Sequence, residues 1–351
     1  MKNRRILSDK IALMGDLHLG VNKNNDRFYH ICDEWVDWFL DELKNYDIKD
    51  IFVLGDWFHY RDEISVNTLD YSANLIEKLT KNHYLHILTG NHDCYLRDTS
   101  EIHSLRSYVG WDKVYIYDKP CQVFFKSSGK SVTVIPWGVN PSDVRKKGDY
   151  IFGHFEINNF KMNNFKVCKD GIESKSLVTD KAKVYTGHFH KYQTIQYKNG
   201  GEITYVGSPY QHDFNDVGCV NGFHVLDTIN DTCVMIENEI SPRFFYLYLS
   251  NLKEDCKKEN IENNFVRIKV DIEIKNANVM DKIIMAVQKM NPLDIEVDDR
   301  DHLPDYVIDD NIDLESFTIE ESIEEYVKNL SDKDEDKILK KLRAIKDSVE
   351  K

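Results

Sequence analysis

The first hundred residues alternate short apolar runs with amphipathic segments. Residues 10–14, 51–54 and 85–88 are largely apolar runs with the length of a buried strand. Between these runs, apolar side chains recur at three- and four-residue steps over residues 31–43 and again over residues 69–79, which predicts two helices with one apolar face each. The order strand, helix, strand, helix, strand favours a sheet with parallel neighbours and helices on its faces.

Beyond Trp111 the pattern changes to a series of short segments that are bounded by turn residues, and such segments predict strands. An α/β layer followed by many strands implies an α/β fold in which two stacked mixed β-sheets are flanked by helices. The predicted strands cover residues 114–117, 122–125, 131–135, 150–152, 184–186, 203–206, 222–227 and 232–237.

A domain boundary is expected near Ser241-Pro242, so that residues 1–240 form the main domain. Residues 241–312 are expected to form a small α+β module, and residues 313–351 a helical tail with two apolar stripes. The elements predicted beyond the boundary are a strand at 266–271, a helix at 279–290 that ends before Pro292, a strand at 293–297, and tail helices at 319–330 and 338–349.

The composition is that of a soluble globular protein, with 41% hydrophobic and 30% charged residues. No run approaches the roughly 20 apolar residues of a membrane span, and the polar stretch Ser8-Asp9-Lys10 interrupts any signal-peptide core. We therefore expect a cytoplasmic protein that does not enter a membrane. The seven cysteines are scattered and never spaced as C-x-x-C, which favours buried free thiols over disulfides or a thiolate zinc site.

The formal net charge of -14 is concentrated in one stretch of the chain. Residues 294–325 contain fourteen acidic residues and one basic residue, Arg300, so the rest of the chain is close to neutral. A near-neutral catalytic region can still bind phosphate, because bound divalent metals supply local positive charge. The charge neither supports nor excludes a nucleic-acid partner.

Five glycine-led clusters of polar side chains follow predicted strands. The carboxyl ends of parallel strands meet at one edge of a sheet, where ligands bind. Aspartate, asparagine and histidine at such an edge are typical ligands of divalent ions, and a preceding glycine permits close approach of the backbone. The clusters are Gly15-Asp16-Leu17-His18, Gly55-Asp56-Trp57-Phe58-His59, Gly90-Asn91-His92-Asp93, Gly153-His154 and Gly187-His188-Phe189-His190.

The spacing within two clusters suggests how ions would be held. In an extended chain, residues two apart project to the same side, so Asp16 with His18, and His188 with His190, could each hold one ion. The donors are oxygens and imidazole nitrogens, which suits Mn²⁺, Fe²⁺ or Zn²⁺. Seven candidate ligands suit two ions about 3.5–4 Å apart that share a carboxylate and activate water for attack on phosphate. A histidine outside the ligand set would protonate the leaving group.

Each of these pieces has a simpler interpretation when it is taken alone. A Gly-Asp at a strand end is usually a turn, G-N-H-D could be a hairpin turn, and a lone His-x-His often has no role. The recurrence of one pattern after five strands favours the metal site. Six other histidines have no such partners in the sequence and are expected to be structural or surface residues: His30, His83, His86, His103, His224 and His302.

In this order, D-x-H, G-D, G-N-H-D, G-H and G-H-x-H resemble the calcineurin-like metallophosphoesterases over about residues 11–207. The resemblance implies that His92 meets the phosphate and protonates the leaving oxygen, and that Asp93 orients His92. It also implies two ligand sets joined by Asp56, namely Asp16, His18, Asp56 and His190 for one ion and Asp56, Asn91, His154 and His188 for the other.

Finer features resemble the nuclease branch of that superfamily. Residues 55–59 match the G-D-x-F-H of SbcD-type nuclease subunits, in which the second histidine, here His59, helps to position DNA. Residues 205–211 resemble the G-S-P segment of the same group, and residues 153–158 resemble the T-even phage recombination endonuclease subunit. The resemblance implies a DNA exo/endonuclease subunit that uses two divalent ions, Mn²⁺ above all, in DNA end processing, recombination and repair.

The layout beyond residue 240 resembles these subunits without a quotable motif. Residues 241–312 occupy the position of a capping, DNA-recognition domain, and residues 313–351 that of helices that bind an SMC-like ABC ATPase. An acidic stretch with amphipathic helices is also common in a plain solvated tail. The resemblance further implies a homodimer through residues 59–73, and the phage-like loop suggests a viral protein of the host cytoplasm.

Two other functions are compatible with part of the pattern. One is a free-standing metallophosphatase or phosphodiesterase that acts on a small molecule or phosphoprotein, but such an enzyme needs neither His59 nor the module and tail that follow residue 240. The other is a scaffold that has lost its chemistry, which the presence of every ligand together with His92 argues against.

Overall fold

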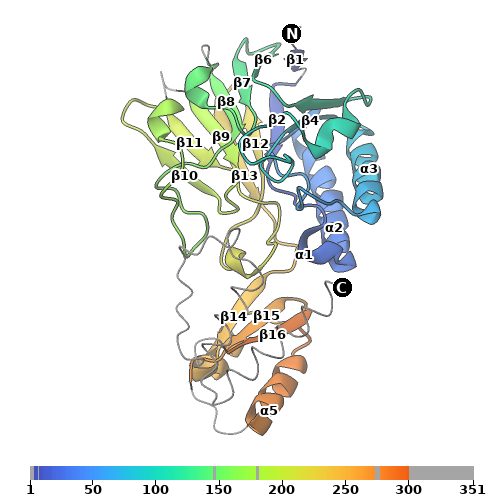
Figure 1. The fold of residues 1–351 in the computed structure, drawn as a ribbon, viewed down its shortest axis with the longest axis vertical. Coiled ribbons are helices and arrows are strands. Elements are labelled where there is room, and N and C mark those ends of the chain that lie inside the picture. Colours follow the sequence, from blue (N-terminus) through green and yellow to red (C-terminus); the bar gives the residue numbers. More distant parts are fainter. Residues whose placement is uncertain (1–3, 7, 145–147, 179–181, 273–276, 300–351) are drawn as a thin grey trace, which may run out of the picture. The chain divides into compact units, whose positions relative to one another are not determined.

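The structure is a computed structural model that describes residues 4–6, 8–144, 148–178, 182–272 and 277–299 (Figure 1). The predicted tail helices and the region assigned to an ATPase partner lie outside these residues. No helix among the described residues is long and apolar enough to cross a membrane.

The first sheet has six strands in the order β13-β12-β2-β3-β4-β5. Strands β2 to β5 are parallel, and β12 pairs antiparallel with both β2 and β13. The two predicted helices, α2 (Asp26–Leu43) and α3 (Val66–Thr80), are confirmed, and the side chains of Asn25 and Ser65 cap their N-termini. The strands are β2 (Lys10–Met14), β3 (Asp50–Val53), β4 (Tyr84–Leu88), β5 (Val114–Tyr117), β12 (Gly222–Asp227) and β13 (Thr232–Glu237).

The second sheet has seven strands in the order β1-β6-β7-β8-β9-β11-β10. It too is mixed, because β6 and β10 pair antiparallel with β7 and β11 while the other pairs are parallel. The sequence did not predict β1 or β10. The strands are β1 (Arg4–Ile6), β6 (Cys121–Phe125), β7 (Ser131–Ile135), β8 (Tyr150–His154), β9 (Lys183–Gly187), β10 (Gln193–Gln196) and β11 (Glu202–Tyr205).

The side chains of the central strand β2 alternate between two buried cores, one of which lies between the two sheets. In β2, Ala12 and Met14 belong to the core that includes Trp35 of α2, whereas Ile11 and Leu13 belong to the core that lies between the sheets. Both faces of β2 are therefore buried, as expected of a parallel strand covered on two sides. The prediction of two stacked mixed sheets flanked by helices is confirmed, and the other face of the second sheet is covered by the segment 155–178.

A third sheet follows residue 240. Strands β14 (Phe244–Tyr248), β15 (Phe265–Lys269) and β16 (Asp294–Asp298) are parallel, and they share a small core with helices α4 (Leu252–Lys258) and α5 (Ala277–Gln288). The predicted helix and the two later strands are confirmed within a few residues, while β14 was not predicted. These elements have the α+β composition that the sequence indicated for this part of the chain, and the domain boundary near residue 240 stays a prediction.

Candidate metal centre

The loops after β2, β3, β4, β8 and β9 converge at one edge of the two sheets. They bring together two clusters of donors, Asp16 with His18 and His190, and Asp56 with His154 and His188. One donor atom from each residue of a cluster lies within 4.8 Å of the donor atoms of the other two. We call these the first and the second cluster. Asn91 belongs with the second cluster, because its Oδ1 lies 2.9 Å from His154 Nε2 and 2.9 Å from His188 Nδ1.

Asp56 lies between the clusters. Its Oδ2 is 3.3 Å from His154 Nε2 and 3.6 Å from His18 Nε2, so one carboxylate faces both groups. The structure therefore gathers all seven residues expected from the sequence and groups them as the family resemblance implied. Their roles as ligands stay a prediction.

The spacing argument for the histidine pair is wrong. Asp16 and His18 do share a cluster, but His188 and His190 face different clusters. The argument assumed extended backbone, whereas Asp16, His18 and His188 have φ of 46°, 50° and 93°, in the left-handed region. Left-handed turns rotate successive side chains differently from a strand, so a spacing of two no longer means the same side.

Several of the predicted ligands have backbone in the left-handed region. With Asp56 at φ 52°, four of the seven predicted ligands have positive φ. Each such residue costs on the order of 1–3 kcal/mol, and strain of this kind persists where the surrounding structure imposes it. Here it is imposed by neighbouring loops: the Asp16 amide donates to Gly55 O at 3.2 Å and the His18 amide to Asp56 O at 3.0 Å.

Two of the glycines are required by close packing around Asp56 and His154. A Cβ at Gly55, which has φ +100°, would lie 2.2 Å from His154 Nδ1. A Cβ at Gly90 would lie 2.2 Å from Asp56 Oδ1. The glycines that precede predicted ligands therefore let the loops approach one another as closely as the clusters demand.

Hydrogen bonds fix the orientation of two histidine rings in the clusters. His154 Nδ1 lies 2.7 Å from Leu54 O, and His190 Nδ1 lies 3.1 Å from the Asp216 carboxylate. Each ring thereby turns its Nε2 toward its cluster, and His18 Nε2 and His190 Nε2 are 3.1 Å apart. A hydrogen bond from the outer ring nitrogen is the usual way that proteins orient histidine ligands of metals.

The donor set fits divalent metal ions. Asp16 and Asp56 are 0% and 1% exposed, and their ion pairs within the described residues are all with histidines. Buried carboxylates need a cationic partner, and nitrogen and oxygen donors without thiolate suit borderline or hard divalent ions. These histidine and aspartate clusters can therefore hold metal ions, while the identity of the metal is not fixed by the donor set.

The electrostatics of the two clusters lead to the same conclusion. Burial raises the pKa of Asp16 to about 6. Burial lowers the pKa of His154, but Asp56 and Asp16 outweigh it and raise that pKa to about 9, whereas burial and His154 together lower the pKa of His188 to about 3. Of these three groups, His154 thus carries an additional proton at neutral pH, which a metal bound to that nitrogen would displace.

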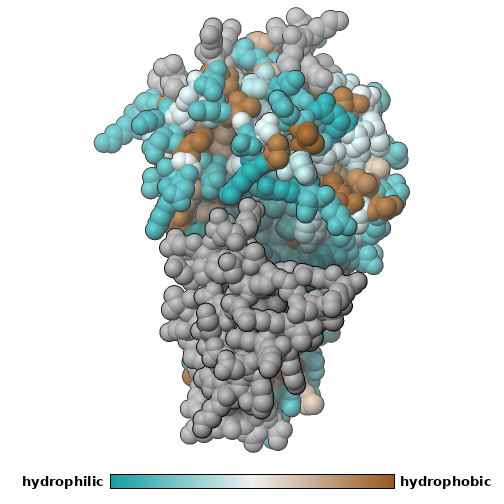
Figure 2. Space-filling model, in the orientation of Figure 1, coloured by the Kyte–Doolittle hydropathy of each residue, from teal (hydrophilic) through white to brown (hydrophobic). Residues whose placement is uncertain are grey.

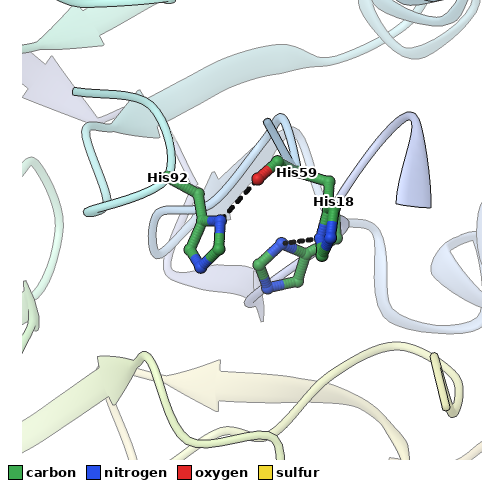
Figure 3. Close-up of side chains that lie close together, drawn as sticks. All are labelled: His18, His59 and His92. Carbon is green, nitrogen blue, oxygen red and sulfur yellow. Dashed lines mark hydrogen bonds between the residues drawn. The ribbon is translucent and has the colours of Figure 1, made fainter. Parts of the chain in front are cut away.

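His92 and His59 lie beside the first cluster (Figure 3). His92 Nδ1 lies 2.5 Å from the main-chain oxygen of His59, which accepts its hydrogen, and His59 Nδ1 lies 3.3 Å from His18 Nδ1. The backbone amide of His92 donates to Asp56 Oδ1 at 2.9 Å. The Nε2 atom of His92 is thus the ring nitrogen left to meet a substrate.

The prediction that Asp93 orients His92 is wrong in this structure. The Asp93 carboxylate accepts hydrogen bonds from the backbone amides of Gly90, Trp57 and Phe58, and the His92 ring is held by the carbonyl of His59 instead. Burial and the charge of Asp56 raise the pKa of Asp93 to about 7. Asp93 therefore ties together the loops that follow β3 and β4.

Sequence reasoning missed His212, Asp216 and Trp137. Asp216 contacts His190, and its Oδ2 accepts from the backbone amide of His212 at 2.8 Å. Both residues follow the segment 205–211 that the sequence singled out, which ends one residue before His212 and five before Asp216. Trp137 has a ring centroid 5.2 Å from that of His188, and no local pattern marks it.

The histidines expected to be structural or on the surface stay apart from the two clusters within the described residues. His86, for example, bridges Asp50 and Tyr117 inside the core. His302 lies outside the described residues. Cys32, Cys94, Cys168 and Cys219 are buried free thiols, as expected, whereas Cys233 and Cys256 are free thiols that are only partly buried.

Comparison with known proteins supports a phosphoesterase type of protein. Over 221 residues the chain is 26% identical to a protein of Invertebrate iridescent virus 3 that bears the name of a phosphoesterase, and the match covers 58% of this chain and 58% of the relative. An archaeal phosphodiesterase structure matches 65% of this chain and 99% of its own at 12% identity, but its TM-score of 0.36 is too low to support an assignment. The sequence matches none of the protein families compared. The two-sheet fold and the viral relative agree with a metallophosphoesterase type of fold.

Proposed function

We propose that this chain is a two-metal phosphodiesterase. The observation that carries the proposal is the pair of adjacent donor clusters that share Asp56, because two ions a few ångströms apart suit in-line attack on a phosphoryl group. When bound, two divalent ions, which we expect to be Mn²⁺, supply Lewis-acid activation of the phosphate and of the attacking water. The viral relative that bears a phosphoesterase name supports the same class.

The protein's own groups would hold the reactants and move one proton. His92 Nε2 donates a proton to the departing oxygen, while the His59 carbonyl keeps the opposite ring nitrogen protonated and the ring in place. Asp216 and the Leu54 carbonyl hold His190 and His154 in the orientation that binding requires. His59 stands beside His18, where it could contact the strand next to the scissile bond.

We infer further that the natural substrate is DNA. This finer proposal rests on the resemblance of residues 55–59 to SbcD-type nuclease subunits and on the place of His59 at the edge of the first cluster. An SMC-like ATPase bound by residues 313–351 remains part of the proposal. A homodimer through residues 59–73 is supported by apolar exposure on α3, where Val66 is 83% and Leu69 is 40% exposed, and Figure 2 shows apolar side chains over this helix.

The test is Mn²⁺-dependent hydrolysis of linear duplex and single-stranded DNA by the purified chain, alongside bis-p-nitrophenyl phosphate and the His92→Asn variant. DNA cleavage that disappears in the variant supports the nuclease. Turnover of the small diester with DNA left intact, even after an SMC-like ATPase is added, favours the free-standing phosphodiesterase. No turnover of either substrate with any divalent metal would contradict the proposal as a whole.

A further inference from the structure

A cavity of about 380 Å³ adjoins the second cluster. Its lining includes His154, Trp137 and Arg97. Small-molecule sites typically occupy roughly 300–1,000 Å³, so the cavity could take a single planar group. None of the steps assigned above to His92, His59 or the metal ligands uses it.

Trp137 is fixed as a wall of this cavity. Its indole Nε1 donates to Arg97 O at 2.6 Å, and its backbone amide donates to Thr89 O at 2.9 Å. Its ring centroid lies 5.2 Å from that of His188 and 5.9 Å from that of His154. Because the indole hydrogen is already used, what Trp137 can offer a ligand is its apolar ring surface.

The loop that carries Trp137 is packed tightly against the loop that carries Arg97. Gly138 has φ +77°, and a Cβ there would lie 2.9 Å from the Cα of Thr99. A larger residue would push the two loops apart. The cavity therefore has a preformed wall, which limits the loss of entropy when a ligand binds.

The charges around the cavity discriminate between parts of a nucleotide. Its lining includes three acidic residues, Asp98, Glu156 and Asp170, and two basic ones, Arg97 and His154, so acidic residues are in excess. A second phosphate would be repelled by that excess of negative charge. The amino groups of a nucleobase are hydrogen-bond donors that carboxylates accept, and the flat base can stack on an indole.

We propose that this cavity binds the nucleobase next to the scissile phosphate, with Trp137 as its stacking surface. The inference rests on the proposed phosphodiesterase function and names the substrate class as nucleotide diesters. The phosphate lies at the two clusters while the neighbouring base enters the cavity. Trp137 then determines specificity for substrates that carry a base.

The experiment uses single-stranded oligonucleotides with one cleavable linkage, each carrying an abasic residue at one position around that linkage. In the wild-type protein with Mn²⁺, removing the base that occupies the cavity should lower kcat/KM about tenfold. In Trp137→Leu the same removal should have no effect, because the stacking surface is gone. Trp137→Phe should keep part of the base dependence, since the aromatic ring survives without the hydrogen bond to Arg97.

Trp111→Leu is the matched control, because Trp111 is 37% exposed and belongs to neither cluster nor to the cavity lining. It should retain the full base dependence. Mn²⁺ affinity, measured by calorimetry, should be unchanged in Trp137→Leu. Base removal that costs the same in wild type and Trp137→Leu at every position would overturn the proposal, as would loss of Mn²⁺ in that variant, since Trp137 would then only support the ligands.

A binding measurement separates this inference from the proposed function. Calorimetry in Mn²⁺ compares 2′-deoxyadenosine 5′-monophosphate with 2-deoxyribose 5-phosphate, which lacks the base. One outcome is that no diester is hydrolysed, but the wild type binds the nucleotide about tenfold more tightly than the sugar phosphate while Trp137→Leu binds both equally. The base site then stands and the proposed catalytic function fails. Equal affinity for both compounds in the wild type overturns the base site, whether or not diesters are hydrolysed.

Discussion

Each cluster of the candidate metal centre contains an aspartate and two histidines, but the histidines are supported differently. In the first cluster, His190 contacts the charged carboxylate of Asp216, whereas in the second, His154 contacts the neutral carbonyl of Leu54. Burial lowers the pKa of His190, but Asp216 outweighs it and raises that pKa to about 10. A carboxylate partner makes an imidazole a stronger donor, so equal ligand types need not give equal metal affinity.

The residues that hold His190 and His154 in place also come from different parts of the chain. Asp216 lies in a short 3-10 helix, Phe214–Asp216, that the small module contacts: the Arg267 guanidinium carbon is 3.9 Å from the centroid of the Phe214 ring, and the Tyr246 hydroxyl donates to Phe214 O at 3.0 Å. Leu54 directly follows β3 in the main domain. The first cluster is therefore linked to the module after residue 240, whereas the support of the second comes from the main domain.

The largest effect is expected from removing what the clusters share. Asp56→Asn should weaken metal binding at both clusters by about 3–5 kcal/mol, because it leaves buried groups without their common charge, and hydrolysis should fall about 1,000-fold or more. Metal content after gel filtration measures the first effect and diester hydrolysis the second. The exposed Asp112→Asn is the control. Retention of one ion at wild-type affinity would show that Asp56 belongs to a single cluster.

His92→Asn should spare both clusters and remove about 10²–10⁴-fold of the DNA cleavage rate, because only the proton donor is lost. The loss should be smaller for bis-p-nitrophenyl phosphate, since its leaving group departs without a proton. Rates on the two substrates and the number of bound Mn²⁺ ions check this. If the variant fails to retain Mn²⁺, His92 is itself a metal ligand and not only the proton donor.

Asp216→Asn tests whether the carboxylate partner of His190 makes the two clusters differ in metal affinity. It should lower Mn²⁺ affinity about 10–100-fold at the first cluster and leave the second unchanged. A two-step calorimetric titration would resolve the sites, and activity should return at high Mn²⁺. Asp213→Asn is the control, because Asp213 caps the same 3-10 helix and asparagine can cap it as well. If Mn²⁺ affinity fell equally in both binding steps, Asp216 would not act on the first cluster alone.

The smallest effect should come from the small module. Arg267→Ala removes the cation–π contact with Phe214 and should lower the free energy of unfolding by about 1 kcal/mol. Affinity at the first cluster should fall about twofold or less, because Asp216 keeps its contact with His190. Urea denaturation and the same titration measure both quantities. A change confined to the second cluster would contradict the link between module and first cluster.

Local patterns in the sequence predicted much of the fold. The central strands and both long helices follow from hydrophobic periodicity, which depends only on neighbours along the chain. Strands β1 and β10 were missed because they lie at the two edges of the second sheet, and β10 lacks a buried face. Strand β14 directly follows the predicted boundary, where Pro242 obscured the apolar run.

The sequence by itself determined which side chains arrive at the site, because Asp16, Asp56 and His188 each follow a glycine at the end of an apolar strand. The tertiary structure, and not the local spacing, decided how they are shared between clusters, since left-handed turns overrode the two-residue spacing of His188 and His190. It also supplied Asp216 and Trp137. These residues act through contacts with residues 26 and 51 positions away, and such contacts depend on sheet order and loop packing that no local pattern encodes.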